Sequence, residues 1–170
     1  MADLVFVLGG ARSGKSRYAQ SYAEQLSEQR IFVATAEPFD DEMADRIARH
    51  QADRGAGWMT VEAPIELAGA ISTYAAADAA LLVDCLTLWL SNVMHTDRDL
   101  ASETDELCSS LRAATGPVVL VSNEVGLGLV PDTALGRAFR DEQGRLNHKI
   151  AAISDRVDFI AAGLPITLKS

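Results

Sequence analysis

The stretch Gly9-Gly10-Ala11-Arg12-Ser13-Gly14-Lys15-Ser16 fits the pattern G-x-x-x-x-G-K-[ST] of a phosphate-binding loop, or P-loop. Glycines let the backbone curl so that successive N–H groups point inward at phosphate oxygens, and the start of the next helix adds positive potential. Lys15 would reach the β- and γ-phosphates, and the Ser16 hydroxyl would join a Mg²⁺ shell. Chance produces such a match about once in a few hundred chains of this length. We therefore expect this stretch to bind a purine nucleoside triphosphate.

The segments on either side of the P-loop predict the strand and the helix that it requires. Leu4–Leu8 is a short apolar run typical of a buried strand, and Ser16–Gln29 contains helix formers without Gly or Pro. Farther along, apolar runs alternate with helix-forming segments. The other expected strands are Arg30–Thr35, Ala80–Asp84, Pro117–Ser122, Val157–Ala162 and Ile166–Lys169, and the other expected helices are Asp41–Asp53, Ile65–Ala77, Leu86–Met94, Ala101–Ala114 and Thr133–Ile153.

This alternation predicts the fold class. The strands are continuous apolar runs, which indicates burial on both faces of a sheet. We expect an α/β protein with a P-loop three-layer fold, a mostly parallel sheet and helices on both faces. The turn Gly163–Pro165 is short enough for a hairpin, so the last strand should be antiparallel. No linker or repeat interrupts the chain, and residues 1–170 are expected to form a single nucleotide-binding domain.

Composition limits the classes of partner. The chain of 170 residues has a formal charge of −9 and no run of basic residues, which argues against nucleic-acid binding. The apolar stretch Ala75–Leu90 is interrupted by Asp78 and Asp84, so no membrane span is expected. The two cysteines lack the spacing of a metal site, which fits reduced thiols in a cytoplasmic protein.

Two segments at the predicted ligand-binding edge of the sheet carry polar side chains whose roles the pattern leaves open. Asp84 ends a predicted strand, where the second acidic residue of a P-loop site holds Mg²⁺ directly or through water. The alternative is the N-cap of the next helix, and the P-loop nearby favours the Mg²⁺ role. Asn123, Glu124 and Gly126 follow another predicted strand. The Glu124 carboxylate would either orient an acceptor or a metal ion, or cap neighbouring backbone.

His50 also admits two interpretations. On its expected helix it shares a face with Met43 and Ile47, which favours a histidine packed at the edge of an apolar face. Arg46 lies four residues earlier on the same side. A nearby positive charge lowers the pKa of an imidazole, so the ring would stay neutral and nucleophilic. Periodicity alone favours the packed histidine.

Five blocks of sequence extend well beyond the P-loop pattern: GGARSGKSRYAQ (9–20), VATAEPFDDEMADRIARHQADR (33–54), WMTVEAP (58–64), LLVDCLTLWLSN (81–92) and VSNEVGLGLVPDTALGRAFRDEQGRLNHKIA (121–151). With the closing GLPITLK, they resemble the bifunctional adenosylcobinamide kinase / adenosylcobinamide-phosphate guanylyltransferase family. The resemblance runs from Leu4 to Lys169.

The resemblance implies a function and a set of site residues. Such an enzyme phosphorylates adenosylcobinamide with ATP or GTP and then transfers GMP from GTP to adenosylcobinamide phosphate, giving adenosylcobinamide-GDP. The P-loop with Lys15 would hold the triphosphate, and His50 would become covalently guanylylated. Further GTP contacts would fall on Ala34, Thr35, Ala36, Gln51, Ala52, Asp53, Arg54, Glu62 and Asp84. A corrinoid acceptor and a homotrimer are implied as well.

The chemistry is consistent with these residue types, although two other functions stay open. A neutral imidazole can attack an α-phosphorus and later leave, and Lys15 with Mg²⁺ could neutralise the departing pyrophosphate. We expect the helix Asp41–Asp53 to move on nucleotide binding, with Pro38 and the Gly55/Gly57 pair as hinges. The alternatives are a P-loop small-molecule kinase without nucleotidyl transfer and a regulatory NTPase.

Overall fold

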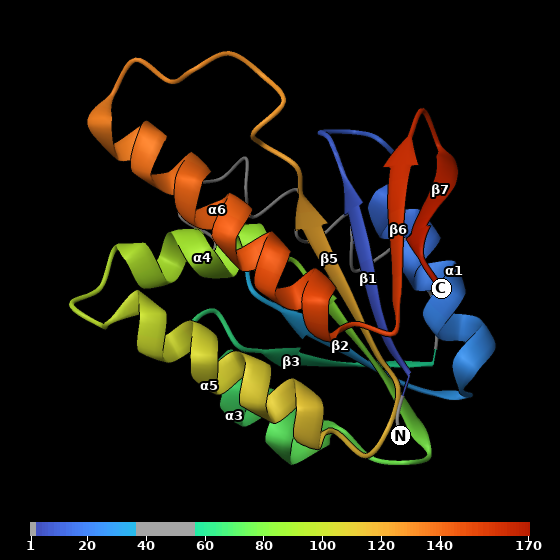
Figure 1. Ribbon diagram of the computed structural model, residues 1–170. Coiled ribbons are helices and arrows are strands. Elements are labelled where there is room, and N and C mark those ends of the chain that lie inside the picture. The colour runs from blue at the N-terminus through green and yellow to red at the C-terminus, as the bar shows by residue number, and fades with distance from the viewer. Residues whose placement is uncertain (1–2, 37–56) are drawn as a thin grey trace.

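The computed structural model describes residues 3–36 and 57–170, which form one seven-stranded sheet with helices on both faces (Figure 1). The strand order is β3-β2-β4-β5-β1-β6-β7. The strands are β1 (Leu4–Gly9), β2 (Gln29–Ala34), β3 (Trp58–Glu62), β4 (Ala79–Asp84), β5 (Val118–Asn123), β6 (Arg156–Ala161) and β7 (Leu164–Lys169). The helices are α1 (Lys15–Leu26), α3 (Leu67–Tyr74), α4 (Leu86–Met94), α5 (Leu100–Ala113) and α6 (Ala134–Ile153).

All neighbouring strands in this sheet are parallel except β6 and β7, which are antiparallel. The predicted α/β class, with a mostly parallel sheet and a C-terminal antiparallel strand, is therefore confirmed. The β6–β7 connection is a tight turn in which Ala162 and Gly163 have φ values of 52° and 80°. Such left-handed conformations at both central residues suit the right-handed twist of a hairpin.

Two hydrophobic cores lie on opposite faces of the sheet. On one face α1 buries Ala19 and Ala23 against strand residues such as Val7, and on the other face α3, α4, α5 and α6 cover residues such as Phe6 (Figure 1). Consecutive strand residues point to opposite faces, so the continuous apolar runs serve both cores. Each fully buried Val, Leu or Phe contributes about 1.5–3 kcal/mol relative to an exposed one.

No apolar run in the sequence indicated β3, which pairs with β2 at the edge of the sheet. Three of its residues, Met59, Thr60 and Glu62, are exposed, so this strand lacks the apolar run that marked the others. The expected first helix is also shorter than predicted, because Gln29 already belongs to β2. The expected helix Asp41–Asp53, with its proposed hinges at Pro38 and Gly55, lies outside the described residues.

The longest described helix, α6, continues for 20 residues through Gly136 and Gly144. It is capped by Thr133, whose Oγ1 accepts a hydrogen bond from the backbone N–H of Gly136 at 3.0 Å. Among residues 3–36 and 57–170, no helix combines the length and apolarity needed to cross a membrane.

Candidate functional site: the P-loop edge of the sheet

The predicted P-loop joins a strand to a helix, as its chemistry requires. β1 ends at Gly9, and α1 begins at Lys15 with Gly14 as its N-cap in the left-handed conformation (φ 92°). The first helical hydrogen bond runs from the N–H of Tyr18 to the carbonyl of Gly14 at 3.0 Å. Backbone N–H groups before that bond have no partner within the helix, and with the helix dipole they form an anion-binding site.

Lys15 lies inside the curl of the loop. Its side chain is 9% exposed, and its Nζ donates a hydrogen bond to the carbonyl of Gly10 at 3.1 Å. The ammonium group is therefore already positioned where the loop amides would face a phosphate. Exchange of this neutral acceptor for an anionic phosphate oxygen would strengthen the interaction, because the attraction between two opposite charges is added to the hydrogen bond.

The turn between β6 and β7 supports the P-loop from the side. The N–H of Gly163 donates to the carbonyl of Ser13 at 2.8 Å. A Cβ atom on Gly14 would lie 3.4 Å from the Cα of Gly163, and one on Gly9 would lie 2.5 Å from Ser13 Oγ and 2.8 Å from the carbonyl oxygen of Ile160. The loop is thus packed between the ends of β1 and β6, and these contacts support its curled shape.

Three of the residues that the sequence singled out form a row across neighbouring strands. Ala34 of β2 is in register with Glu62 of β3 on one side and with Asp84 of β4 on the other. Strands are spaced about 4.8 Å apart, so roughly 10 Å separates the backbones of Glu62 and Asp84. The row lies at the carboxyl ends of the strands, the edge at which open α/β sheets bind ligands.

This row faces the same side of the sheet as the P-loop helix. Leu82 and Phe32 belong to the core under α1, and the side chains two residues farther along the strands, Asp84 and Ala34, point the same way. Asp84 is in register with Val121 of β5, which in turn is in register with Val7 of β1, two residues before Gly9. The structure thus brings Ala34, Glu62 and Asp84 to the α1 face at the P-loop end.

Asp84 does not cap the helix that follows it. The N-cap of α4 is Cys85, without a side-chain cap hydrogen bond, and the Asp84 carboxylate makes no hydrogen bond to another residue in the described ranges. Burial and the adjacent Asp84 charge raise the pKa of the Cys85 thiol to about 11. The thiol is therefore protonated near neutral pH and is not a nucleophile. At this end of β4, the side chain available to bind a ligand is therefore the Asp84 carboxylate.

Thr35 has a structural role at the same edge. Its Oγ1 donates to the carbonyl of Cys85 at 2.7 Å and accepts from the Cys85 N–H at 2.8 Å, which ties the end of β2 to the end of β4. The amide of Asn92 donates to the carbonyls of Thr35 at 2.8 Å and Pro64 at 3.0 Å. The Thr35 hydroxyl is thus engaged, so a nucleotide contact from this residue would come from its backbone. Ala36 follows it, half-buried.

Several predicted site residues fall where the structure gives no description. His50 and the four residues after it, Gln51, Ala52, Asp53 and Arg54, lie outside the described residues. Their roles remain predictions. Within the described part of the chain, no group of three or more His, Cys, Asp or Glu side chains is arranged to hold a metal ion.

Glu124 caps its own loop. Its Oε1 accepts a hydrogen bond from the N–H of Gly126 at 2.6 Å, and its own N–H donates to the carbonyl of Gly9 at 3.1 Å. Of the two roles that the sequence left open, these contacts favour the local cap over an acceptor or metal ligand.

Beneath Asn123 lies a buried polar cluster that sequence reasoning missed, formed by Thr87 of α4, Ser122 of β5, and Gln143 and Asn147 of α6. The exposed fractions of these side chains range from 0 to 8%. Gln143 and Asn147 are four residues apart on one helical face, a spacing that could have indicated a shared environment.

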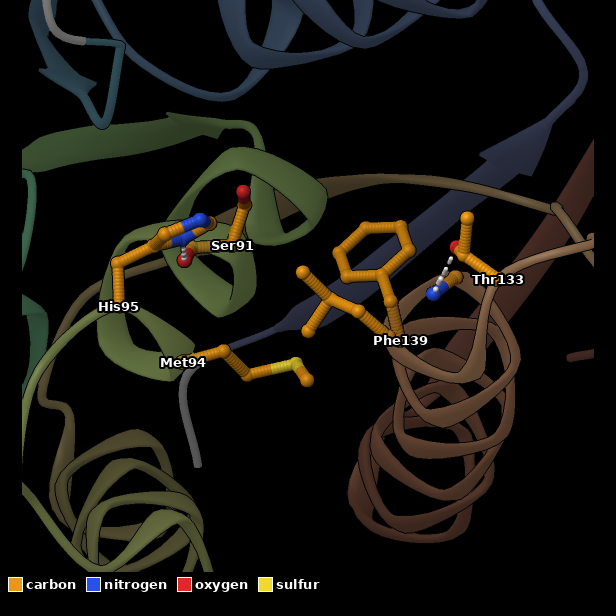
Figure 2. A pocket seen from close by; sticks show the side chains of 7 residues that line it. Ser91, Met94, His95, Thr133 and Phe139 are labelled. Atoms are coloured by element: carbon orange, nitrogen blue, oxygen red, sulfur yellow. Dashed lines mark hydrogen bonds between the residues drawn. The ribbon is translucent and has the colours of Figure 1, made fainter.

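A pocket of about 300 Å³ lies between α4 and the start of α6 (Figure 2). Met94, Leu135 and Phe139 supply its apolar side chains, while His95 Nδ1 hydrogen bonds with the carbonyl of Ser91 at 2.6 Å. No P-loop residue lines the pocket, and it lies on the face of the sheet opposite α1. It is therefore not the phosphate site.

Comparisons with known proteins identify relatives of this chain. The model of one protein family, described as "Cobinamide kinase / cobinamide phosphate guanyltransferase", matches residues 5–168. The chain is 47% identical to the "Bifunctional adenosylcobalamin biosynthesis protein CobP" of Pseudomonas aeruginosa, covering 99% of this chain and 98% of that protein. It is 35% identical to the "Bifunctional adenosylcobalamin biosynthesis protein CobU" of Salmonella typhimurium, covering 98% of this chain and 99% of that protein.

Solved structures with a similar fold are more distant in sequence. The RadB recombinase superposes with a TM-score of 0.54 at 14% identity, over 92% of this chain and 73% of that one. The flagellar accessory protein FlaH from Methanocaldococcus jannaschii gives a TM-score of 0.53 at 12% identity, over 98% and 78% of the two chains. At such identities the likeness concerns the fold alone.

Proposed function

Since the chain belongs to the cobinamide kinase / cobinamide phosphate guanyltransferase family, we propose that one triphosphate site, built on its P-loop, serves two reactions. The protein is a bifunctional enzyme of cobalamin biosynthesis. It phosphorylates adenosylcobinamide with ATP or GTP, and it transfers GMP from GTP to adenosylcobinamide phosphate, which gives adenosylcobinamide-GDP. The observation that carries the site is Lys15 Nζ held inside the loop, 3.1 Å from the Gly10 carbonyl.

In the kinase step, the P-loop binds the phosphates and disperses their charge. Residues Gly9–Ser16 present backbone N–H groups at the positive end of α1, and Lys15 moves from Gly10 to the β- and γ-phosphates. The acceptor hydroxyl attacks the γ-phosphorus and loses its proton, while the bond from that phosphorus to the bridging oxygen breaks and a nucleoside diphosphate leaves. Catalysis then consists mainly of positioning and charge stabilisation.

The donor set at this edge fits Mg²⁺. Ser16 at the start of α1 offers a hydroxyl, and Asp84 offers a carboxylate that does not cap α4. Mg²⁺ prefers a few hard oxygen ligands of this kind, together with substrate phosphates and water. We assign these two residues to the ion, which when bound neutralises phosphate charge. Ala34 and Glu62, which are neighbours in the row described above, would then flank the nucleoside. Thr35 and Ala36 would contribute backbone groups.

The guanylyltransferase step requires a nucleophile, and we assign that role to His50. Its imidazole nitrogen would attack the α-phosphorus of GTP, with loss of pyrophosphate. An oxygen of adenosylcobinamide phosphate would then attack the same phosphorus and release the imidazole. Residues Gln51–Arg54 would contact the nucleotide after the histidine, as the family resemblance implies. Lys15 would stabilise the departing pyrophosphate, as it stabilises the γ-phosphate in the kinase step.

The family resemblance also implies a homotrimer, with the corrinoid and a nucleoside triphosphate as its small-molecule partners. We place the enzyme in the cytoplasm because its two cysteines fit reduced thiols. Sedimentation equilibrium of the purified protein tests the oligomeric state, because a trimer would have three times the mass of the 18.2 kDa chain.

One labelling experiment separates guanylyl transfer from the two alternative functions, and a second assay with γ-labelled ATP and cobinamide separates those two from each other. The protein is incubated with GTP labelled at the α-phosphate and quenched in denaturant. We expect chain-bound label that is labile in acid and stable in alkali, as a histidine phosphoramidate is, and that is lost in His50→Gln and in Lys15→Ala. His148→Gln, which changes an exposed histidine of α6, is the matched control and should label normally.

The other outcomes identify the alternatives. A plain small-molecule kinase would transfer the γ-phosphoryl group to cobinamide without labelling the chain. A regulatory NTPase would hydrolyse the nucleotide slowly, without phosphorylating cobinamide and without labelling the chain. Label that persists in His50→Gln would show that another residue is the nucleophile.

A further inference from the structure

Asn123, the last residue of β5, lies between the P-loop strand and the strand that carries Asp84. β5 is flanked by β1 and β4, and Asn123 is in register with Gly9, the first residue of the P-loop. Asp84 is in register with Val121, so Asn123 extends two residues farther toward the ligand side. Asn123 is therefore the residue of β5 that lies nearest to the P-loop.

The side chain of Asn123 is on the same face of the sheet as the P-loop helix. Val119 and Val121 pack in the core under α1. Asn123 comes two residues after Val121, so its side chain points to the same face of the sheet. Ser122, which points to the opposite face, bonds to α6 instead. Asn123 is half-buried, and its side-chain amide makes no hydrogen bond to any residue in the ranges 3–36 and 57–170. The amide is thus available for a ligand.

The backbone of Asn123 is held by side chains on both of its polar groups. Its N–H donates to Thr87 Oγ1 at 2.8 Å, and its carbonyl accepts from Asn147 Nδ2 at 3.1 Å. The next N–H, that of Glu124, donates to the carbonyl of Gly9 at 3.1 Å. Three hydrogen bonds therefore fix this strand end relative to α4, α6 and the P-loop.

The two side chains that hold Asn123 are themselves oriented by the buried cluster. Asn147 Oδ1 accepts from Ser122 Oγ at 2.8 Å and from Gln143 Nε2 at 3.0 Å, and the hydroxyls of Thr87 and Ser122 lie 3.4 Å apart. Buried polar groups cost free energy unless they are hydrogen-bonded, and apolar residues would fill the same layer without that cost. The cluster therefore serves orientation rather than stability.

We propose that the side-chain amide of Asn123 donates a hydrogen bond to the terminal phosphate of the bound nucleoside triphosphate, and that Thr87 and Asn147 position it. This inference rests on the proposed P-loop site. In the kinase step the contact falls on the transferred γ-phosphoryl group. In the guanylyltransferase step it falls on the departing pyrophosphate. Asn123 would thus serve both reactions without touching the α-phosphorus.

The test compares Asn123→Ala, Asn123→Asp and Lys15→Ala with the wild type. For each protein, kcat and KM of the kinase step are measured, together with the affinities for a fluorescent GTP and a fluorescent GDP. Loss of one donor to the developing charge should lower kcat about 10²-fold in Asn123→Ala. Asn123→Asp should lose more, because a carboxylate of nearly the same shape repels the phosphate. GDP affinity should stay within about threefold in both variants, because the terminal phosphate is absent.

Failure of this inference is distinguishable from failure of the P-loop site. Lys15→Ala should lose affinity for both nucleotides, and wild-type affinity in that variant would overturn the proposed site itself. Loss in Lys15→Ala with wild-type kcat in both Asn123 variants would overturn only the inference. An Asn123→Asp enzyme as active as Asn123→Ala, or one that loses GDP and GTP affinity equally, would also overturn it.

A matched pair of variants at position 87 tests the positioning role of Thr87. Thr87→Val removes the hydroxyl that accepts from the Asn123 N–H and should lower kcat about 10-fold with little change in KM. Thr87→Ser keeps the hydroxyl and should rescue most of that loss. Equal kcat in Thr87→Val and Thr87→Ser would contradict the positioning role, and thermal melts of both variants identify any loss of fold.

Discussion

The two adjacent glycines that open the P-loop should respond very differently to a single methyl group. A Cβ on Gly9 would lie 2.5 Å from Ser13 Oγ and 2.8 Å from the carbonyl oxygen of Ile160. The serine hydroxyl can rotate away, but the Ile160 oxygen belongs to the backbone of β6, which pairs with β1 at this point. Apart from its chain neighbours, no atom of residues 3–36 and 57–170 lies within 4 Å of a Cβ added to Gly10, and the φ of Gly10 is not positive.

The magnitude follows from the size of these contacts. Overpacking of a well-packed site costs about 1–3 kcal/mol. For a domain of this size each kcal/mol shifts Tm by about 2–4 °C, so Gly9→Ala should lower Tm by about 2–12 °C. Gly10→Ala should leave Tm unchanged or raise it slightly, because alanine restricts the unfolded chain. The assay is thermal unfolding followed by circular dichroism without nucleotide, together with GTP affinity, which Gly9→Ala should weaken.

This pair also explains the motif itself. The pattern demands glycine at the first position and tolerates any residue at the second, and the structure supplies a steric reason in the approach of Ile160 to Gly9. Equal Tm values for Gly9→Ala and Gly10→Ala would refute the reasoning, because the clash at position 9 would then be relieved without cost.

The remaining predictions concern groups around the site. Asp158→Asn should reduce the free energy of unfolding at pH 7 by about 2 kcal/mol, because Asp158 is fully buried and accepts hydrogen bonds from Tyr18, Arg156 and Thr167. Burial alone would raise the pKa of Asp158, but these hydrogen bonds outweigh it and lower the pKa below its ordinary value of 3.8, so their contribution is full above about pH 4 and falls as the carboxylate is protonated at lower pH. The difference in free energy of unfolding between the two proteins, measured with urea, should therefore be smaller at about pH 3 than at pH 7, and a constant difference would contradict this. Asn92→Ala should cost about 1–3 kcal/mol in urea unfolding, since it leaves the carbonyls of Thr35 and Pro64 without their donor, and an unchanged midpoint would exclude that role. Arg98→Ala removes ion pairs with the exposed Glu66 and with Glu103 and should leave the midpoint of urea unfolding nearly unchanged, because exposed ion pairs add little to stability; a clearly lower midpoint would contradict this.

Much of the fold was predictable because its central strands are buried on both faces. Runs such as Leu4–Leu8 carry apolar residues at every position, which a sequence pattern reveals directly. β3 was missed because an edge strand of five residues with exposed positions depends on pairing with β2, not on an apolar run of its own. Its formation is a long-range property that local patterns do not encode.

The site was predictable where a motif fixes the backbone and not where register or tertiary contacts decide. The P-loop and the carboxylate of Asp84 at a strand end were both visible in the sequence. The alignment of Glu62 with Asp84 arises only through their shared partner Ala34 on β2. Asn147 carried no recognisable motif, and only the packing of α6 on β5 shows its contact with Asn123.

The most direct test of the triphosphate site is a crystal structure of the protein with a non-hydrolysable GTP analogue and Mg²⁺. The account predicts that Lys15 Nζ leaves the Gly10 carbonyl and lies about 3 Å from a β- or γ-phosphate oxygen, with the loop amides around the same phosphates. A nucleotide bound elsewhere, for example in the pocket between α4 and α6 with Lys15 still bonded to Gly10, would contradict it.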